Sequence, residues 1–404
     1  MKQYDIVVVG AGIVGLTCAL ALANSPLKIA VVDAARGKIA PSDAPLPRVS
    51  AISIASKQVF ESLGVWHMLD HTRMQAYDAM HVWEQDSFAE IDFSAQQVQQ
   101  NALGYIIEND HIIAQMQSKA VDIQNIDLLL GSKIQELTLS KDTQALQLDN
   151  QDMVLAKLVV GADGGNSLVR RVAGYPQTFW SYNQNALVTT VETEIAHNNT
   201  ARQVFTEFGP LALLPLWQPN LCSIVWSQDT EMAEQLNQLA PAEFDKRLTA
   251  AFDVKLGRLN SVDKLHSFPL TMQYARQWVG DGAVIIGDAA HTIHPLAGQG
   301  ANLGIMDAAA LAETLLDSME NDTLIDPQLL RKFERWRKSE SAKMTATMEL
   351  FKQLFAGKHP AKKLLRGVGM SITNKVMPAK KEIILQAMGV AGELPNLARS
   401  SSAK

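Results

Sequence analysis

Hydrophobic positions at the start of the chain fall into two short apolar runs with a helical stretch between them. The first run, Asp5–Val9, is typical of a strand buried on both faces. The second, Ile29–Val32, ends at Asp33, and the residues between the runs place apolar side chains three and four positions apart. We therefore predict a strand–turn–helix–strand unit. Because this unit contains glycines and continues into a second strand, Ile6–Ala23 is not interpreted as a secretory signal peptide.

The turn after the first strand has the spacing of a dinucleotide-binding loop. Gly10 permits the tight turn, Gly12 lets a pyrophosphate approach the backbone, and Gly15 lets the helix pack against the strand. The helix N-terminus offers unpaired N–H groups to the phosphates. Asp33, at the end of the next strand, is placed to accept hydrogen bonds from a ribose. This pattern predicts a dinucleotide site but does not distinguish FAD from NAD.

Two more apolar runs, Lys157–Val160 and Ala283–Ile286, each end in a glycine-rich turn. The first turn carries Asp163 and Arg170, which can hold polar groups near a phosphate or a nicotinamide. The second carries Asp288 and leads to the glycine-rich start of a long Ala/Leu-rich helix. An acid at this place can bind a ribityl hydroxyl, which favours a flavin.

The same helix start offers backbone N–H groups near Gly300 and Ala301. These groups can face the pyrimidine end of a flavin, where negative charge develops on reduction.

Strand-like alternation in 76–99 and 181–269 predicts a mostly antiparallel sheet that can roof a pocket above the flavin. The fold class we expect is α/β: a Rossmann-like FAD-binding domain, an inserted antiparallel-sheet substrate domain and a C-terminal helical region. We assign the FAD-binding domain to 1–75, 100–180 and 270–330, the substrate domain to 76–99 and 181–269, and the helical region to 331–404.

Composition narrows the classes of function. A chain of 404 residues that is 47% hydrophobic and 19% charged can bury large cores, and its net charge of −6 argues against a nucleic-acid binder. Two cysteines without metal-ligand spacing favour a reducing cytoplasm. His291 and His294 form an HxxH pair without the acid of a metalloprotease motif, so a structural or electrostatic role is expected for both.

Charge is distributed unevenly along the chain. Residues 331–404 hold 16 Lys and Arg against 5 Glu, a net charge of +11, whereas 1–330 carry −17. This asymmetry is compatible with contact between the C-terminal region and a membrane surface or an acidic partner. A solvated helical face rich in lysine explains it equally well.

The three glycine-rich motifs together resemble the single-component FAD-dependent aromatic hydroxylases, the family of para-hydroxybenzoate hydroxylase, over about residues 4–390. Within that family, three stretches resemble the hydroxylases of ubiquinone biosynthesis: Arg48–Ser53, Leu63–Trp66 and Gly287–Asp307. Four more are most similar to those acting on 2-polyprenylphenol: Val82–Phe88, Thr178–Trp180, Cys222–Ser227 and Pro360–Arg366.

This resemblance implies a set of cofactor-binding residues. Arg48 matches an arginine that reaches the phosphates or the flavin rim, and Asn109 matches a polar residue near the pyrophosphate. The full set is Gly10, Gly12, Gly15, Asp33, Arg48, Asn109, Asp163, Asp288, Pro295, Gly298, Gly300, Ala301 and Asn302. No catalytic residue is assigned; Tyr105, Tyr182 and Tyr274 are unranked candidates for deprotonating a phenol, and an enzyme without a dedicated base is an alternative.

The resemblance also implies an activity. NAD(P)H would reduce FAD transiently, dioxygen would give a C4a-hydroperoxyflavin, and its distal oxygen would hydroxylate the ring of a polyprenylphenol. One alternative is the later hydroxylase acting on the methoxy-methyl-benzoquinol; a more remote one is a non-catalytic, prenyl-lipid-binding accessory subunit. A cytoplasmic location, with peripheral contact at the inner face of the membrane, is expected. The tail length and the oligomeric state are left open.

Overall fold

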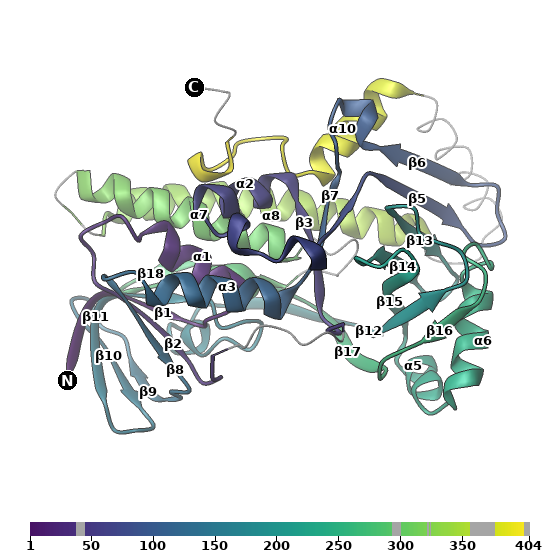
Figure 1. Ribbon diagram of the computed structural model, residues 1–404. Coiled ribbons are helices and arrows are strands. Elements are labelled where there is room, and N and C mark those ends of the chain that lie inside the picture. The colour runs from purple at the N-terminus through teal and green to yellow at the C-terminus, as the bar shows by residue number, and fades with distance from the viewer. Residues whose placement is uncertain (38–44, 293–299, 321–322, 324, 356–375, 400–404) are drawn as a thin grey trace.

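We describe the protein from a computed structural model that covers residues 1–37, 45–292, 300–320, 323, 325–355 and 376–399. Figure 1 shows two lobes side by side, each built on its own sheet, with helices packed against both. The first lobe contains the chain start and most of the long helices. The arrangement is α/β, as the sequence pattern predicts.

The first lobe is built on a largely parallel sheet with β1 at its centre. β1 pairs in parallel with β2 on one side and with β11 on the other, so that Val7 lies opposite both Ala30 and Val159. These central side chains are fully buried, which accounts for the continuous apolar runs in the sequence. The strands are β1 (Lys2–Val9), β2 (Ile29–Asp33), β8 (Ile126–Leu130), β9 (Ile134–Thr138), β10 (Gln144–Leu148), β11 (Met153–Gly161), β18 (Val279–Gly280) and β19 (Ala283–Ile285).

Helices cover this sheet, and α1 contacts both α3 and α7. The helices of the first lobe are α1 (Ile13–Ala21), α2 (Ile54–Ser62), α3 (Asn109–Val121), α4 (Leu168–Val172), α7 (Gly300–Glu320) and α8 (Pro327–Phe355), with the 3₁₀ turns η1 (Trp66–Met68), η2 (His71–Arg73) and η4 (Gly287–Ala289). No helix among the described residues is both long enough and apolar enough to cross a membrane.

The second lobe is built on a mostly antiparallel sheet in the order β20-β17-β12-β15-β14-β13-β5-β6, with β16 beside β12. β12 is 17 residues long and contains the predicted domain boundary at 180/181. The strands are β5 (Ala79–Glu84), β6 (Glu90–Ser94), β12 (Gln177–Thr193), β13 (Thr200–Phe205), β14 (Pro210–Pro215), β15 (Leu221–Asp229), β16 (Leu259–Ser261), β17 (His266–Ala275) and β20 (His291–Thr292).

The two faces of this second sheet have different neighbours. α5 (Thr230–Asn237) and α6 (Pro241–Ala251) cover one face, where Leu187, Ile224 and Trp226 pack against them. The other face turns toward the first lobe, because Leu214 packs there against Ala51 of the small sheet. That small sheet consists of β3 (Val49–Ser53), β7 (Gly104–Glu108) and β4 (Gln75–Tyr77) and lies between the lobes.

The C-terminal part of the chain joins the lobes. α10 (Met377–Ala387) packs Ile384 against η3 (Ala95–Val98), while Ala55 of α2 donates its backbone N–H to Met388 at 3.2 Å. The 3₁₀ turn η6 (Asn396–Ala398) returns to α2 and α7. The C-terminal segment therefore contacts elements of both lobes.

Candidate active site

The turn between β1 and α1 forms a cradle of backbone. Gly10 has a φ of +108°, and a Cβ there would collide with the backbone oxygen of Ala162 at the end of β11. At Gly12, by contrast, a Cβ would have nothing within 4 Å, and Gly12 caps α1 without a side-chain hydrogen bond. The first N–H groups of α1 thus border open space. This geometry fits a pyrophosphate.

Asp33 at the end of β2 reaches this turn. Its Oδ2 accepts the backbone N–H of Ala11 at 2.7 Å and its Oδ1 that of Ala35 at 2.7 Å. A carboxylate has about four acceptor positions, so it can still accept ribose hydroxyls. The direct contact with the turn shows that β2 lies close enough for the short Asp33 side chain to reach it.

The first and third glycine-rich motifs, although far apart in the sequence, meet at α1. A Cβ on Gly287 would lie 3.1 Å from Val14 of α1, and one on Gly304 of α7 would lie 3.2 Å from Gly287. The turn that carries Asp288 is therefore packed directly against the helix that follows the first glycine loop. Gly300 and Ala301 begin α7 beside this junction and are partly exposed. Pro295 and Gly298 lie outside the described residues.

Asp288 and Arg48 lie near each other, and we call the region between the turn that carries Asp288 and the second sheet the recess. The Asp288 side chain is accessible to solvent, yet the surrounding protein raises its pKa, an effect that His291 and Arg48 partly offset. Arg48, just before β3, also lies with its Cζ 5.9 Å from the ring centre of Phe268 in the second lobe. Arg48 thus stands where the recess meets the second sheet.

Two predicted residues hold β3. Asn109 donates its backbone N–H to Arg48 at 3.0 Å and accepts the Ser50 hydroxyl at 2.6 Å. Asn302 donates to the carbonyl of Ala51 at 2.8 Å and accepts the N–H of Ser53 at 2.9 Å. Both side chains fix the strand that begins beside Arg48. Their direct contact with a cofactor stays a prediction.

Asp163 and Arg170 link two of the glycine-rich turns. Asp163 Oδ2 accepts the N–H of Leu168 at 2.6 Å at the start of α4, while its Oδ1 is buried with no partner among the described residues. The buried Arg170 donates to the carbonyls of Gly165 at 2.6 Å and Ala289 at 2.9 Å. Arg170 therefore ties the Asp163 turn to the Asp288 turn, a role that the sequence alone does not specify.

A buried ionic network that sequence reasoning missed lies behind Asp288. Asp307 of α7 accepts Nε2 of His291 at 2.6 Å and Nε of Arg337 at 2.8 Å, and it also accepts the N–H of Gly287 at 3.2 Å. Burial alone would raise the pKa of Asp307, but the charges of His291 and Arg337 outweigh it and hold that pKa below its ordinary value. His291 thus has the structural and electrostatic surroundings expected for it.

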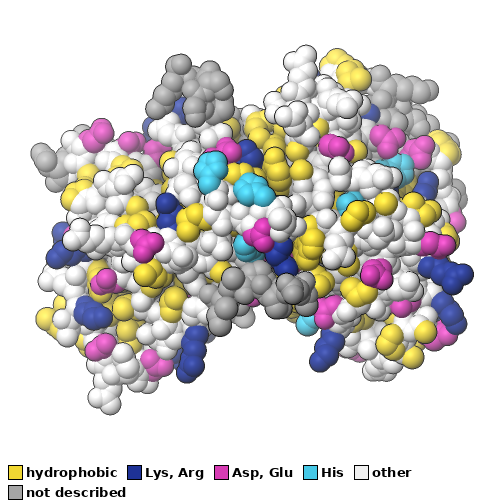
Figure 2. All heavy atoms as spheres, in the orientation of Figure 1, with side chains coloured by type: hydrophobic (Ala, Val, Ile, Leu, Met, Phe, Trp, Pro, Cys, Tyr) yellow, Lys and Arg dark blue, Asp and Glu magenta, His cyan; other side chains and the backbone are white. Residues whose placement is uncertain are grey.

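The second sheet supplies an apolar wall to the recess. Val188, Val225 and Ala212 lie directly opposite one another on β12, β15 and β14, and all three are partly exposed although their strands are central. Phe268 shares their face, since its partner Ala186 lies two residues from Val188. The wall therefore faces Arg48. Figure 2 shows hydrophobic side chains gathered where the two lobes meet.

The three tyrosines considered as bases each have different neighbours. Tyr105 packs edge-on against Trp66 at 4.9 Å between ring centres, and Tyr274 donates its hydroxyl to the carbonyl of Lys338 at 3.3 Å. Tyr182 lies in an irregular part of β12 and is partly exposed. None of these contacts ranks one tyrosine above the others as a base.

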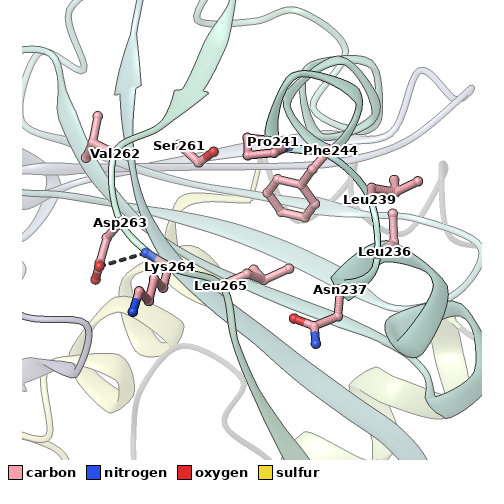
Figure 3. Close-up of a pocket in the computed structure, with 10 residues that line it drawn as sticks. All are labelled: Leu236, Asn237, Leu239, Pro241, Phe244, Ser261, Val262, Asp263, Lys264 and Leu265. Carbon is pink, nitrogen blue, oxygen red and sulfur yellow. Dashed lines mark hydrogen bonds between the residues drawn. The ribbon is translucent and has the colours of Figure 1, made fainter.

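A separate depression of about 630 Å³ lies between α5, α6 and the turn before β17 (Figure 3). Leu236 and Phe244 line it together with Leu265 and Lys264. Because α5 and α6 cover the face of the sheet that turns away from Arg48, this depression is not part of the recess.

Comparison with known proteins shows the family to which this chain belongs. A family profile described as "FAD binding domain" matches residues 3–347. The chain is 32% identical to the 3-demethoxyubiquinol 3-hydroxylase of Escherichia coli over 96% of its own length and 99% of that protein. The chain belongs to the FAD-dependent hydroxylases of ubiquinone biosynthesis.

Other relatives of this hydroxylase agree. It is 33% identical to the mitochondrial ubiquinone biosynthesis monooxygenase COQ6 of Drosophila melanogaster over 96% of its own length and 90% of that protein. Its fold matches the crystal structure of p-nitrophenol 4-monooxygenase PnpA from Pseudomonas putida with a TM-score of 0.80, 20% identity, and coverage of 97% of this chain and 100% of that one. The hydroxylase is an FAD-dependent enzyme, and NAD(P)H and dioxygen are the co-substrates typical of its class.

Proposed function

We propose that this hydroxylase acts on the aromatic ring of a polyprenylphenol intermediate. The observation that carries the proposal is the wall of Val188, Val225 and Ala212, which is small, apolar and open toward Arg48 and Asp288. Such a wall suits an aromatic ring with a hydrocarbon substituent.

Each residue around the recess would contact a different part of FAD or of the substrate. The first N–H groups of α1 would hold the pyrophosphate of FAD, and Asp33 would hold its ribose. Asp288 would bind the ribityl chain, and Arg48 would stand at the flavin rim beside the substrate wall. FAD, when bound, supplies the redox chemistry that activates dioxygen. The apolar wall orients the ring and excludes water, so that the activated oxygen reacts with the substrate and is not lost to water.

The later hydroxylation of a methoxy-methyl-benzoquinol is the second candidate. It is favoured by the 32% identity to an enzyme named 3-demethoxyubiquinol 3-hydroxylase. The polyprenylphenol step is favoured by the stretches Val82–Phe88, Thr178–Trp180 and Cys222–Ser227, which resemble hydroxylases of that step. The fourth such stretch, Pro360–Arg366, lies outside the described residues. In the structure Val82, Val225 and Ser227 lie on the face of the second sheet that forms the wall.

Deleting the gene and analysing the quinone intermediates distinguishes the two steps. We expect a polyprenylphenol to accumulate, and the wild-type gene but not an Ala212→Phe variant to restore ubiquinone. Accumulation of the demethoxy quinone would instead assign the later step. The purified protein should be yellow, and a phenol should stimulate its oxidation of NAD(P)H. A colourless protein that binds prenyl lipids without oxidising NAD(P)H would favour an accessory role.

For the basic C-terminal region we propose contact with an anionic lipid surface that holds the substrate. Met377 and Val376 expose 52% and 43% of their surface at the start of α10, beside the exposed Lys381. Apolar side chains next to lysines are suited to an anionic membrane surface. The protein should sediment with vesicles containing anionic lipid and stay free with neutral ones. Equal binding to both would contradict an electrostatic contact.

A further inference from the structure

A buried ion pair lies between the two lobes, away from the glycine-rich motifs. Arg73 of η2 and Glu108 at the end of β7 form two parallel hydrogen bonds, Nε to Oε2 at 2.9 Å and Nη2 to Oε1 at 2.8 Å. The side chains are 12% and 1% exposed. Two-pronged pairing of this kind fixes the orientation of both groups, which a single contact would not do.

The carboxylate of Glu108 also holds the segment that carries Arg48. Its Oε1 accepts the backbone N–H of Leu46 at 2.7 Å, two residues before Arg48. The next residue along, Asn109, donates its N–H to the carbonyl of Arg48 at 3.0 Å. Arg48 is thus tied on both sides to the junction of β7 and α3. A shift of Glu108 must move the backbone from which the Arg48 side chain projects.

The guanidinium of Arg73 faces the second lobe. Its Cζ lies 4.4 Å from the ring centre of Trp217, which follows β14, the strand that carries Ala212. This is a close stacking distance for arginine over an aromatic ring. Trp217 also packs against the cluster that contains Ala51 and Leu214, where the small sheet meets the second sheet. The Arg73 side chain therefore contacts both Trp217 of the second lobe and Glu108, the acid that holds the segment before Arg48.

We propose that Arg73 is a positioning residue. Through Glu108 it fixes the position of Arg48 relative to the cofactor, and through Trp217 it fixes the position of Arg48 relative to the second lobe. This inference rests on the proposed role of Arg48 at the flavin rim. The described contacts of Arg73 are with Glu108 and Trp217, and Glu108 holds the backbone beside Arg48. The effect of Arg73 on cofactor binding is therefore expected to depend on Arg48.

A double-mutant cycle tests this path. We expect Arg73→Met to raise the Kd for FAD about tenfold, on the order of one hydrogen bond to a charged group. Arg48→Met should raise it at least as much, and the double variant should bind FAD no more weakly than Arg48→Met alone. Arg73→Lys keeps the charge but loses the fork and the stacking, so an intermediate Kd is expected. Binding is measured by flavin fluorescence on the apoprotein, next to the visible spectrum of the bound flavin.

Arg202→Met is the matched control. Arg202 is a partly buried arginine of the second lobe that donates to the carbonyls of His197 and Thr200, far along the chain from Arg48. Its replacement should lower the unfolding midpoint while leaving the Kd for FAD within about twofold, since the lost bonds lie away from the cofactor. A folded Arg73→Lys variant with unchanged Kd, or an Arg73→Met effect that appears in full on top of Arg48→Met, would overturn the proposal. An unchanged Kd in Arg48→Met would instead overturn the role given to Arg48 itself.

Discussion

Replacing Asp307 by asparagine removes a charge from a side chain that solvent does not reach. The side chain is 0% exposed and that of its partner Arg337 is 3% exposed, at 2.8 Å. Asparagine has almost the same shape, and its oxygen can still accept from Arg337. His291 can adapt as the neutral ring, in which Nε2 accepts from the new amide, whereas the N–H of Gly287 then faces that amide and loses its acceptor. The guanidinium, however, stays buried with no opposing charge.

The magnitude follows from that unpaired charge. Breaking a buried ion pair by removing one partner costs about 3–5 kcal/mol, whereas replacing both partners by neutral groups is often neutral. We therefore expect Asp307→Asn to lower the free energy of unfolding by about 3 kcal/mol, the lower end of that range, since one hydrogen bond survives. Asp307→Asn with Arg337→Met should recover at least about 1 kcal/mol of the loss.

Urea unfolding of the protein saturated with FAD, followed by circular dichroism, measures both values. FAD release as a function of urea adds a second readout, because Asp307 also holds the N–H of Gly287 next to Asp288. We expect Asp307→Asn to release FAD before the protein unfolds. A loss below 1 kcal/mol, or a double variant less stable than the single one, would refute the assignment of Asp307 as the charge partner of Arg337.

Three further results are expected. Gly10→Ala should lower stability, because the φ of +108° at Gly10 and its closeness to the residue after β11 exclude a side chain. Gly12→Ala should fold normally but weaken FAD binding. Equal melting points for the two variants would contradict the difference in space described for the two glycines. Ala212→Phe should raise KM for a phenolic substrate at least about tenfold with the Kd for FAD unchanged, as expected when a large side chain fills an apolar seat. Burial lowers the pKa of His111 and of His197 from the ordinary value of 6.5, so the unfolded chain takes up protons first as the pH falls, and the free energy of unfolding should decrease below about pH 6.5. Unfolding at pH 7.5 and 5.5 checks this, and a variant with both histidines replaced by glutamine that keeps the full pH dependence would contradict it.

The cofactor motifs could be predicted because each is local. Gly10, Gly12 and Gly15 lie within six residues, and Asp33 follows at the end of the next strand, so spacing alone indicates how they come together. The same holds for the fold class, since alternating strand and helix patterns at the chain start require a parallel sheet. The boundary predicted at 180/181 falls inside β12, because a continuous strand pattern gives no sign of where one domain ends and the next begins.

The networks that hold these motifs could not be predicted. Arg73 and Glu108 are 35 residues apart, and Asp307 and Arg337 are 30 apart, and single charged residues of this kind are common along the chain. Which of them are buried together depends on how β7, α7 and α8 pack. Arg170 carried a signal, its place after a glycine turn, but its bonds to two carbonyls follow only from the meeting of that turn with the Asp288 turn.

The long strand β12 has a consequence for how the molecule can be divided. Its first residues pair with the part of β17 that reaches the Asp288 region through β20, and its last residues belong to the centre of the second sheet. A cut at 180/181 would sever one continuous ladder of hydrogen bonds. Neither lobe is thus a module that could be excised and exchanged with a relative, and any chimaera of these hydroxylases has to inherit β12 and β17 from the same parent.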